Sequence, residues 1–248
     1  MYPSSQQAWH IQATAEVVQT LRADTQQGLS SAEAQARLAH YGHNQLAEKP
    51  RPTFLQRFIA QFQNFVIYIL LFAIVVSFVL GDQLEAFIIA AIVILNAILG
   101  VVQEGRAEQA LEALKKLAAP EARVRRDGET KMIGAAHLVP GDIILLEAGD
   151  QIPADLRLVE AIHLKVEEAA LTGESEAVDK KADLRVKDDA ALGDRRNMTY
   201  MGTLATYGRG KGVVVGTGMS TEMGKIASLL ESTEEEETPL QKRLNQLG

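Results

Sequence analysis

A short polar motif, Leu171-Thr172-Gly173-Glu174-Ser175, holds the residues of this sequence that are best suited to chemistry. Apolar residues lead into Thr172, and Gly173 permits a tight turn and the close approach of another surface. We expect Glu174 and Ser175 to lie on an exposed turn, where a carboxylate can orient or deprotonate a water molecule. A plain polar turn between two strands is the alternative, and so short a motif does not decide between them.

The composition narrows the classes of protein and site. The chain has 248 residues and a formal net charge of −7. It has no basic arm or basic stripe interleaved with aromatic residues, which argues against nucleic-acid binding. It contains no cysteine, so disulfides and thiolate metal sites are excluded. No spacing of carboxylates completes a metal site with the histidines, so we predict no metal ligands and no cofactor-binding residues.

Two long apolar stretches predict a transmembrane helical hairpin. They cover about residues 58–81 and 85–103 and are almost free of charge. Each is about as long as a helix needs to cross a hydrocarbon core of roughly 30 Å. Only residues 81–85 separate them, so the two helices form a hairpin. The second stretch is slightly short for a span, and a buried core helix is its alternative.

The charges that flank the hairpin predict its orientation. Lys49 and Arg57 precede the first stretch, and Arg106 and Lys115 follow the second, whereas the charges of loop 81–85 are all acidic. The positive-inside rule therefore places the N-terminus and the domain after the hairpin in the cytoplasm. We predict an integral membrane protein, and the compact loops favour a prokaryotic plasma membrane.

The hairpin divides the chain into four predicted parts, and the fold class is α+β. Residues 1–50 form a helical N-terminal segment, and residues 51–105 contain the hairpin. Residues 106–231 form a mostly β domain flanked by helices, within which residues 180–196 predict a charged loop. Residues 232–248 form a linker.

The β domain alternates short strand-like runs with turn signals. Asp127-Gly128 predicts a tight hairpin turn after the first run. Glycines 208, 210 and 212 predict a loose turn between the last two strands.

Several short motifs follow one another along the chain. They are Asn96-Ala97-Ile98-Leu99-Gly100-Val101-Val102-Gln103-Glu104, Val139-Pro140-Gly141-Asp142, Gly149-Asp150-Gln151-Ile152-Pro153-Ala154-Asp155, Leu171-Thr172-Gly173-Glu174-Ser175, Met201-Gly202-Thr203, Thr221-Glu222-Met223-Gly224-Lys225-Ile226 and Thr238-Pro239-Leu240-Gln241-Lys242. Each is weak alone, but their order after a membrane hairpin is specific. Together they resemble the N-terminal part of P-type cation-transporting ATPases, especially the branch of the calcium pumps and their sodium/potassium-pump relatives. The resemblance covers nearly the whole chain.

This resemblance implies a fold and a mechanism. Residues 106–231 would be the actuator domain of a pump, and residues 232–248 would lead to a third transmembrane helix. A catalytic aspartate elsewhere in the pump would attack ATP and form an aspartyl-phosphate. The actuator domain would then present Glu174, which positions the attacking water and accepts its proton, while Thr172, Gly173 and Ser175 shape the loop. Rotation of the domain would pull on the first two helices and couple hydrolysis to ion access.

The resemblance also implies partners. These are the phosphorylation and nucleotide domains and the later transmembrane helices of the same pump, the lipid bilayer and the transported cation. ATP and Mg²⁺ would bind to those domains, and the phosphorylated Asp-Lys-Thr-Gly-Thr motif is absent here, so this chain alone is expected to be inactive. Calcium is the preferred cation. Gln63 and Asn64 stand where the muscle calcium pump has adjacent carboxylates, which leaves sodium, potassium, protons or manganese open.

Two other interpretations stand beside the pump. The chain could be a standalone, membrane-anchored, actuator-like module that binds a partner and catalyses nothing. It could also be a soluble β-domain enzyme that uses Glu174 as a general base. That enzyme needs a second catalytic group, for which His137 and His163 are the candidates, although we expect structural roles for both.

Overall fold

The computed structural model describes residues 7–47, 53–62, 65–117 and 120–232. Contacts divide the chain into two compact units. One combines Met1–Ala47 with Pro120–Gly248, and the other is Glu48–Ala119. The helical segment before the hairpin therefore shares a unit with the β domain that follows it, and the predicted α+β class is confirmed.

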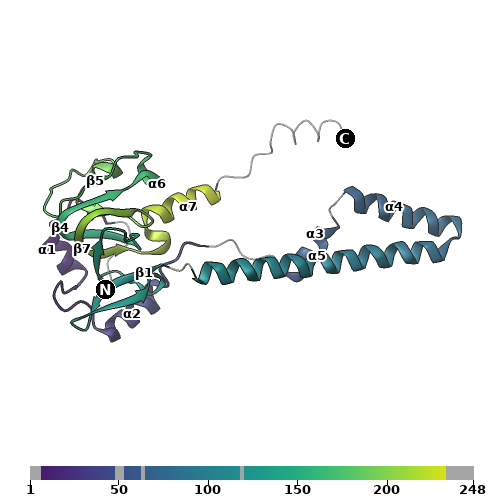
Figure 1. Ribbon diagram of the computed structural model, residues 1–248, viewed down its shortest axis with the longest axis horizontal. Coiled ribbons are helices and arrows are strands. Elements are labelled where there is room, and N and C mark those ends of the chain that lie inside the picture. The colour runs from purple at the N-terminus through teal and green to yellow at the C-terminus, as the bar shows by residue number, and fades with distance from the viewer. Residues whose placement is uncertain (1–6, 48–52, 63–64, 118–119, 233–248) are drawn as a thin grey trace. The chain divides into compact units, whose positions relative to one another are not determined.

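The first unit is built on a seven-stranded sheet in the order β2-β1-β3-β7-β4-β5, with β6 paired to β4. The strands are β1 Glu121–Arg126, β2 Glu129–Gly134, β3 Ile143–Glu147, β4 Asp155–Glu167, β5 Val178–Asp179, β6 Met198–Thr199 and β7 Leu204–Gly216. All of these pairings are antiparallel, and the long strands β4 and β7 form the centre of the sheet (Figure 1).

The predicted hairpin turn between β1 and β2 is confirmed. Arg126 pairs with Glu129, so Asp127 and Gly128 are the two turn residues. Both have positive φ, 53° and 77°, as a two-residue hairpin turn requires.

The predicted turn at glycines 208, 210 and 212 is wrong, because all three lie inside the continuous strand β7. They serve close packing against β4 instead. A Cβ on Gly210 would lie 2.8 Å from Leu164 Cδ2, and a Cβ on Gly212 would lie 2.9 Å from the Cβ of Leu156. Gly208 combines a φ of +75° with backbone contact to His163, next to an irregularity in the β4–β7 register. Missing side chains thus let two long strands approach each other.

Alternating residues of the strands build the main core. On β4, Leu156, Leu158, Leu164 and Val166 are fully buried, and they pack with residues of β1, β3 and β7. A second cluster joins the N-terminal segment to the sheet. It contains Trp9, Val17, Leu21, Ile143, Met198, Tyr200, Val213 and Val215.

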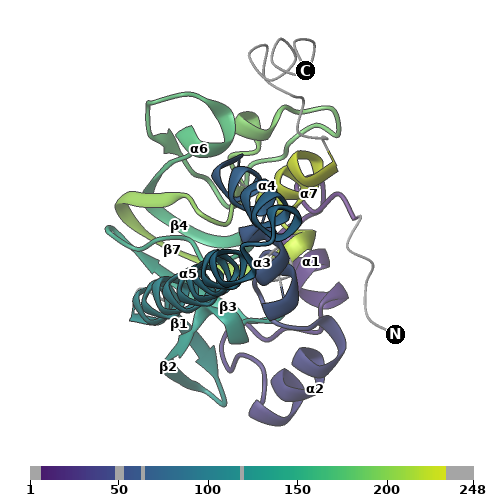
Figure 2. The same cartoon turned by 90° about the vertical axis from the view of Figure 1, so that its right-hand side faces the viewer.

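Helices surround this sheet. They are α1 Thr14–Thr20, α2 Ser31–Tyr41, α6 Ala169–Thr172 and α7 Glu222–Ser232, with 3-10 turns η1 Ala135–His137, η2 Leu192–Asp194 and η3 Gly218–Ser220. Ser30 caps the start of α2 by accepting a hydrogen bond from the amide of Glu33 at 3.2 Å, and Gly42, with φ of 79°, caps its end. Figures 1 and 2 show α6 at the opposite end of the unit from α2.

Two buried polar side chains fasten the N-terminal segment to the sheet. Arg37 donates through Nη1 to the carbonyl oxygens of Leu21 and Pro140, both at 2.8 Å. Asn44 donates through Nδ2 to Ala135 and Pro153 and accepts from the amide of Gly218.

The second unit contains α3 Phe54–Gln61, α4 Phe65–Leu80 and α5 Gln83–Leu117. Among the described residues, Gln83–Glu108 of α5 is long and apolar enough to cross a membrane. The predicted first span differs from the structure, because α3 and α4 share it and are bent by 73°. The 16 residues of α4 extend about 24 Å, less than a typical hydrocarbon core. Gln63 and Asn64 lie between the two helices, outside the described residues.

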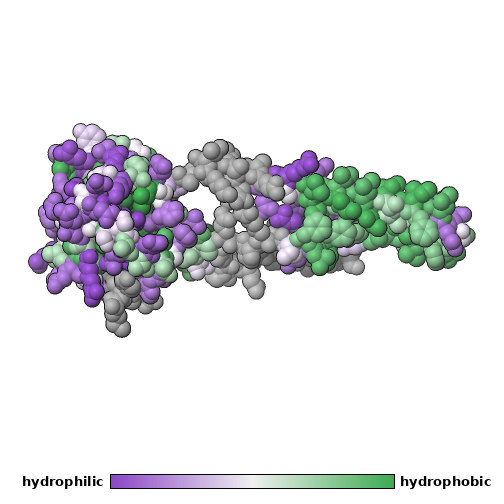
Figure 3. Space-filling model, turned by 90° about the horizontal axis from the view of Figure 1, so that it is seen from below, coloured by the Kyte–Doolittle hydropathy of each residue, from purple (hydrophilic) through white to green (hydrophobic). Residues whose placement is uncertain are grey.

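The surface of this unit suits a lipid environment. Figure 3 shows hydrophobic residues over the hairpin and hydrophilic residues at its two ends. Large side chains such as Phe72, Val79 and Leu84 are exposed, and only 22% of the apolar window of α5 is buried. A buried core helix, the alternative for the second stretch, does not fit this exposure.

Candidate functional site

The candidate site is the loop that joins β4 to its neighbour β5. Residues 172–175, here called the TGES loop, begin at Thr172, the last residue of the short helix α6. Gly173 ends α6 in the left-handed conformation with φ of 76°, which explains why a glycine stands there. No heavy atom lies within 4 Å of the Cβ that Gly173 lacks, so within the described residues its surroundings are open.

Backbone hydrogen bonds give the TGES loop a defined shape. The carbonyl oxygen of Glu168 accepts from the amides of Leu171 and Thr172 at 2.9 and 3.0 Å, and from the Thr172 hydroxyl at 3.1 Å. The Thr172 hydroxyl in turn accepts from the amide of Glu174 at 3.3 Å. Thr172 therefore links the start of the loop to Glu174.

The carboxylate of Glu174 points to no partner within the part of the chain that the structure describes. Glu174 and Ser175 are exposed, as the sequence predicts. No hydrogen bond or ion pair reaches the Glu174 side chain from any described residue; its amide alone is bonded. A free carboxylate on a fixed loop can accept a proton from a water that another surface supplies.

The loop rests on residues of the charged segment and the core. Leu171 and Leu192 pack against the cluster around Tyr200. A Cβ on Gly193 would lie 3.4 Å from Thr172 Cγ2, so η2 touches the loop directly.

A buried ion pair beneath the loop is a feature that the sequence reasoning missed. Glu168 and Lys180 are fully buried, with Lys180 Nζ 2.6 Å from Glu168 Oε1. Burial raises the pKa of Glu168 and lowers that of Lys180, and the opposite charge of the partner opposes each shift. Lys180 begins the predicted charged loop and does lie outside the strands, but its side chain is buried. The two-residue period of Leu164, Val166 and Glu168 is the signal that could have placed Glu168 in the core.

The two candidate histidines of the soluble-enzyme interpretation serve other roles. His137 lies against the ring of His43 at 5.6 Å between centroids, and its carbonyl oxygen accepts from Arg126. His163 has a φ of 51° at the irregular part of β4. Among the described residues no hydrogen bond joins either histidine to Glu174, so neither His137 nor His163 is placed as the second catalytic group that this interpretation needs.

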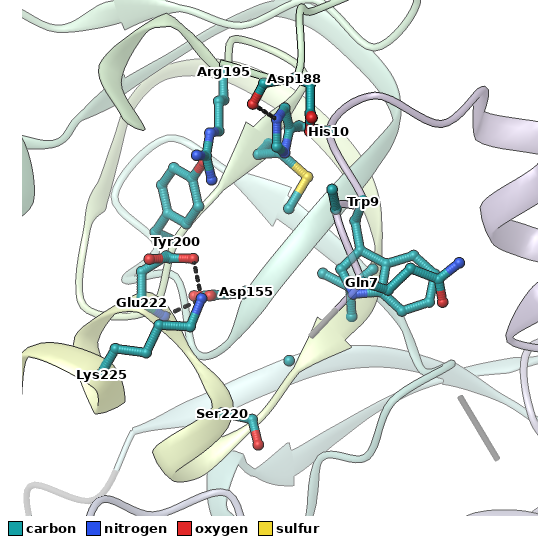
Figure 4. Close-up of a pocket in the computed structure, with 14 residues that line it drawn as sticks. Gln7, Trp9, His10, Asp155, Asp188, Arg195, Tyr200, Ser220, Glu222 and Lys225 are labelled. Atoms are coloured by element: carbon teal, nitrogen blue, oxygen red, sulfur yellow. Dashed lines mark hydrogen bonds and ion pairs between the residues drawn. The ribbon is translucent and has the colours of Figure 1, made fainter. Parts of the chain in front are cut away.

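A cavity of about 370 Å³ lies elsewhere in the same unit, between the N-terminal residues, η3 and α7 (Figure 4). Asp155 lines it and is only 5% exposed. Its carboxylate accepts from the amides of Met201 at 2.9 Å and Glu222 at 2.8 Å, so it holds the start of α7. Burial raises the pKa of Asp155 to about 7, although both amides lower it. Burial also raises the pKa of Tyr200 at the cavity wall.

The described residues contain no group of three or more histidine and carboxylate side chains that could hold a metal ion. Within these residues the TGES loop can act as a base or as a docking element.

Comparison with known families shows two matches along the chain. Residues 116–231 match the P-type ATPase actuator domain, and residues 9–77 match the N-terminus of cation transporter/ATPases. The TGES loop lies inside the first match.

Individual relatives agree with these matches. The chain is 50% identical over 244 residues to "Calcium-transporting ATPase 1" of Bacillus cereus, covering 97% of this chain and 28% of that protein. It is 48% identical over 240 residues to "Calcium-transporting ATPase" of Bacillus subtilis, covering 97% and 27%. It is 43% identical over 229 residues to "Probable cation-transporting ATPase F" of Mycobacterium tuberculosis, covering 92% and 25%. The chain thus spans about a quarter of the length of these relatives.

Proposed function

Because this chain belongs to the P-type cation-transporting ATPase family, we propose that it is the N-terminal part of an ATP-driven cation pump. It carries the N-terminal segment and the actuator domain of that family. In this pump the actuator domain drives hydrolysis of an aspartyl-phosphate intermediate. The observation that carries the proposal is the exposed Glu174 carboxylate, fixed through its backbone and without a partner in the described residues.

The chemistry assigned to this chain is proton acceptance. Hydrolysis of an acyl phosphate needs a water aligned opposite the leaving carboxylate. Glu174 would orient that water and take its proton as the bond to phosphorus forms. Because the TGES loop must be brought to the phosphate, hydrolysis waits for a movement of the actuator domain.

The remaining parts of the pump lie outside this chain. ATP supplies the phosphoryl group and Mg²⁺ neutralises its charge, and both would be held by the phosphorylation and nucleotide domains. The partners are those domains, the later transmembrane helices, the lipid bilayer and the cation. We propose calcium as that cation, because the relatives at 50% and 48% identity are named calcium-transporting.

The membrane placement is part of the same proposal. The helix Gln83–Glu108 and the bent pair α3–α4 would cross a bacterial plasma membrane. The basic residues on the outer flanks of the hairpin would keep the actuator domain in the cytoplasm.

The test is the substitution Glu174→Ala in the complete pump that contains this sequence. We expect the phosphoenzyme to form at the normal rate from radiolabelled ATP and to decay about 10²–10⁴-fold more slowly, the usual contribution of a general base. Glu176→Ala is the matched control, because Glu176 is an exposed carboxylate two residues further along the same loop. Normal decay in the Glu174 variant would remove the role that we assign to this residue.

A further inference from the structure

The buried ion pair of Glu168 and Lys180, here called the anchor pair, lies at the two ends of the loop that carries Glu174. Glu168 is the first residue after β4, and Lys180 is the first residue after β5. Both side chains are 0% exposed, and Nζ and Oε1 are 2.6 Å apart. The pair therefore links the two ends of the loop through a buried side-chain contact.

Apart from each other, the two charged groups of the anchor pair have few polar neighbours that would stabilise their charges. Neither charged group has a further hydrogen-bond partner among the described residues. The Nζ of Lys180 also lies over the ring of Tyr200, 5.9 Å from its centroid. Removing two charges from water is costly, and apolar residues of similar volume often stabilise a fold as well or better. A stabilising role alone therefore does not account for charges at this place.

The strand ladder that should close the loop is short. β5 has two residues, and it pairs with β4 only at Lys165↔Asp179 and Val166↔Val178. Beyond that ladder, one backbone bond from the Lys180 amide to the Leu164 carbonyl, at 2.9 Å, holds the second end of the loop. The anchor pair adds a side-chain cross-link where the ladder ends.

An unbroken series of contacts leads from the anchor pair to Glu174. The Glu168 side chain is held by Lys180, and the Glu168 carbonyl oxygen accepts from the Thr172 hydroxyl and amide. The Thr172 hydroxyl accepts from the Glu174 amide. A shift of Glu168 therefore moves the acceptors that fix the backbone of Glu174.

We propose that the anchor pair is a positioning device that holds the TGES loop in the conformation in which Glu174 reaches the phosphate. Glu168 and Lys180 act through Thr172 and touch neither water nor phosphate themselves. This inference rests on the proposed function of Glu174.

The first experiment measures loop order in the whole chain in detergent micelles. Hydrogen exchange of the amides 171–174 is compared between the wild type and the double variant Glu168→Gln/Lys180→Met, which removes both charges and leaves none buried without a partner. We expect exchange of these amides to become about tenfold faster, with unchanged protection of β4 and β7. The matched control is Lys165→Met/Asp179→Asn, since that pair joins the same two strands at 3.8 Å but is exposed.

Two results of this experiment would overturn the proposal. Equal exchange of amides 171–174 in the wild type and the double variant would show that the pair does not order the loop. Loss of protection throughout the domain would show that the pair holds the fold and not the loop.

The second experiment separates this inference from the proposed function. In the complete pump, the double variant should form phosphoenzyme at the normal rate and hydrolyse it about 10–100-fold more slowly, as expected for a misplaced catalytic group. If Glu174→Ala slows decay and the double variant does not, the anchor pair has no positioning role. If Glu174→Ala itself leaves decay unchanged, the proposed function fails, while the exchange measurement still decides whether the pair orders the loop.

Discussion

The buried carboxylate of Asp155 predicts that the stability of the first unit falls as pH rises through neutrality. Burial raises the pKa of Asp155 from 3.8 to about 7 in the folded chain. Between these values the folded state holds a proton that the unfolded state has released, so unfolding releases a proton. The contribution of Asp155 to the free energy of unfolding is fully present below about pH 4 and is lost as pH rises through 7.

The size of the effect follows from the shift. One pKa unit corresponds to about 1.4 kcal/mol, so the full interval amounts to about 4 kcal/mol. About 2–3 kcal/mol of this falls between pH 5 and pH 7, where the chain can be handled. Two amide donors, those of Met201 and Glu222, work in the opposite direction by favouring the carboxylate. The pKa of Asp155 is thus set by desolvation, which raises it, against two amide hydrogen bonds, which lower it.

The assay is urea unfolding of the whole chain in detergent at pH 5 to 8.5, followed by tryptophan fluorescence. Trp9 is the only tryptophan of the sequence, is buried, and lines the same cavity as Asp155 (Figure 4). Asp155→Asn should abolish this part of the pH dependence. It should also lower stability at every pH, because its amide nitrogen faces one of the two amide donors.

An exposed aspartate, Asp127, provides the control. In Asp127→Asn the pH dependence between 5 and 8.5 should stay that of the wild type, because hydrogen bonds from Ser31 lower the pKa of the exposed Asp127. Equal slopes in the wild type and Asp155→Asn would refute the reasoning. That result would mean that the two amides, and not desolvation, set the charge of Asp155.

Three further substitutions test the packing of the N-terminal segment by urea unfolding of the whole chain. Gly28→Ala should cost about 2–4 kcal/mol, because φ is +71° and the new Cβ would overlap the carbonyl oxygen of Arg125. Gly42→Ala should cost only about 1–2 kcal/mol, because φ is +79° but the space around the new Cβ is open. Equal losses of stability in the two glycine variants would contradict the steric explanation. Asn44→Ala should cost about 2–4 kcal/mol, because the Pro153 carbonyl oxygen and the Gly218 amide lose their partner among the described residues, while the Ala135 carbonyl oxygen keeps only the Leu138 amide. An unchanged unfolding midpoint would show that water replaces the amide.

Local chemistry explains which parts of the fold the sequence could predict. The turn at Asp127-Gly128 needs two residues that tolerate positive φ, and that requirement is visible in a dipeptide. The two ends of α2 also depend on local chemistry, because Ser30 can accept a hydrogen bond from the first turn and Gly42 can adopt a positive φ. The exposure of Glu174 was also predictable, since glycine and serine flank it.

The parts that sequence reasoning missed depend on partners far along the chain. A glycine signals a turn unless another strand needs its space, and only the register of β4 against β7 shows that Gly210 and Gly212 serve close packing. Lys180 stands in a run of charged residues. The two-residue period of β4 can place Glu168 in the core, but it does not show that Lys180 is the partner of Glu168. The bend between α3 and α4 was also missed, because the apolar composition of this stretch predicts one continuous span.

The division of the first unit by the hairpin has a consequence for how the protein is made. Trp9, Val17 and Leu21 leave the ribosome long before Val213 and Val215, with which they form one buried cluster. At about 5–20 residues per second, roughly ten seconds or more of synthesis separates the two halves of this core. If the hairpin spans the membrane as proposed, it enters the bilayer during that time, while the apolar N-terminal side chains remain uncovered. The nascent chain therefore offers a chaperone a defined early segment, and translation speed across residues 120–215 should influence the yield of folded protein.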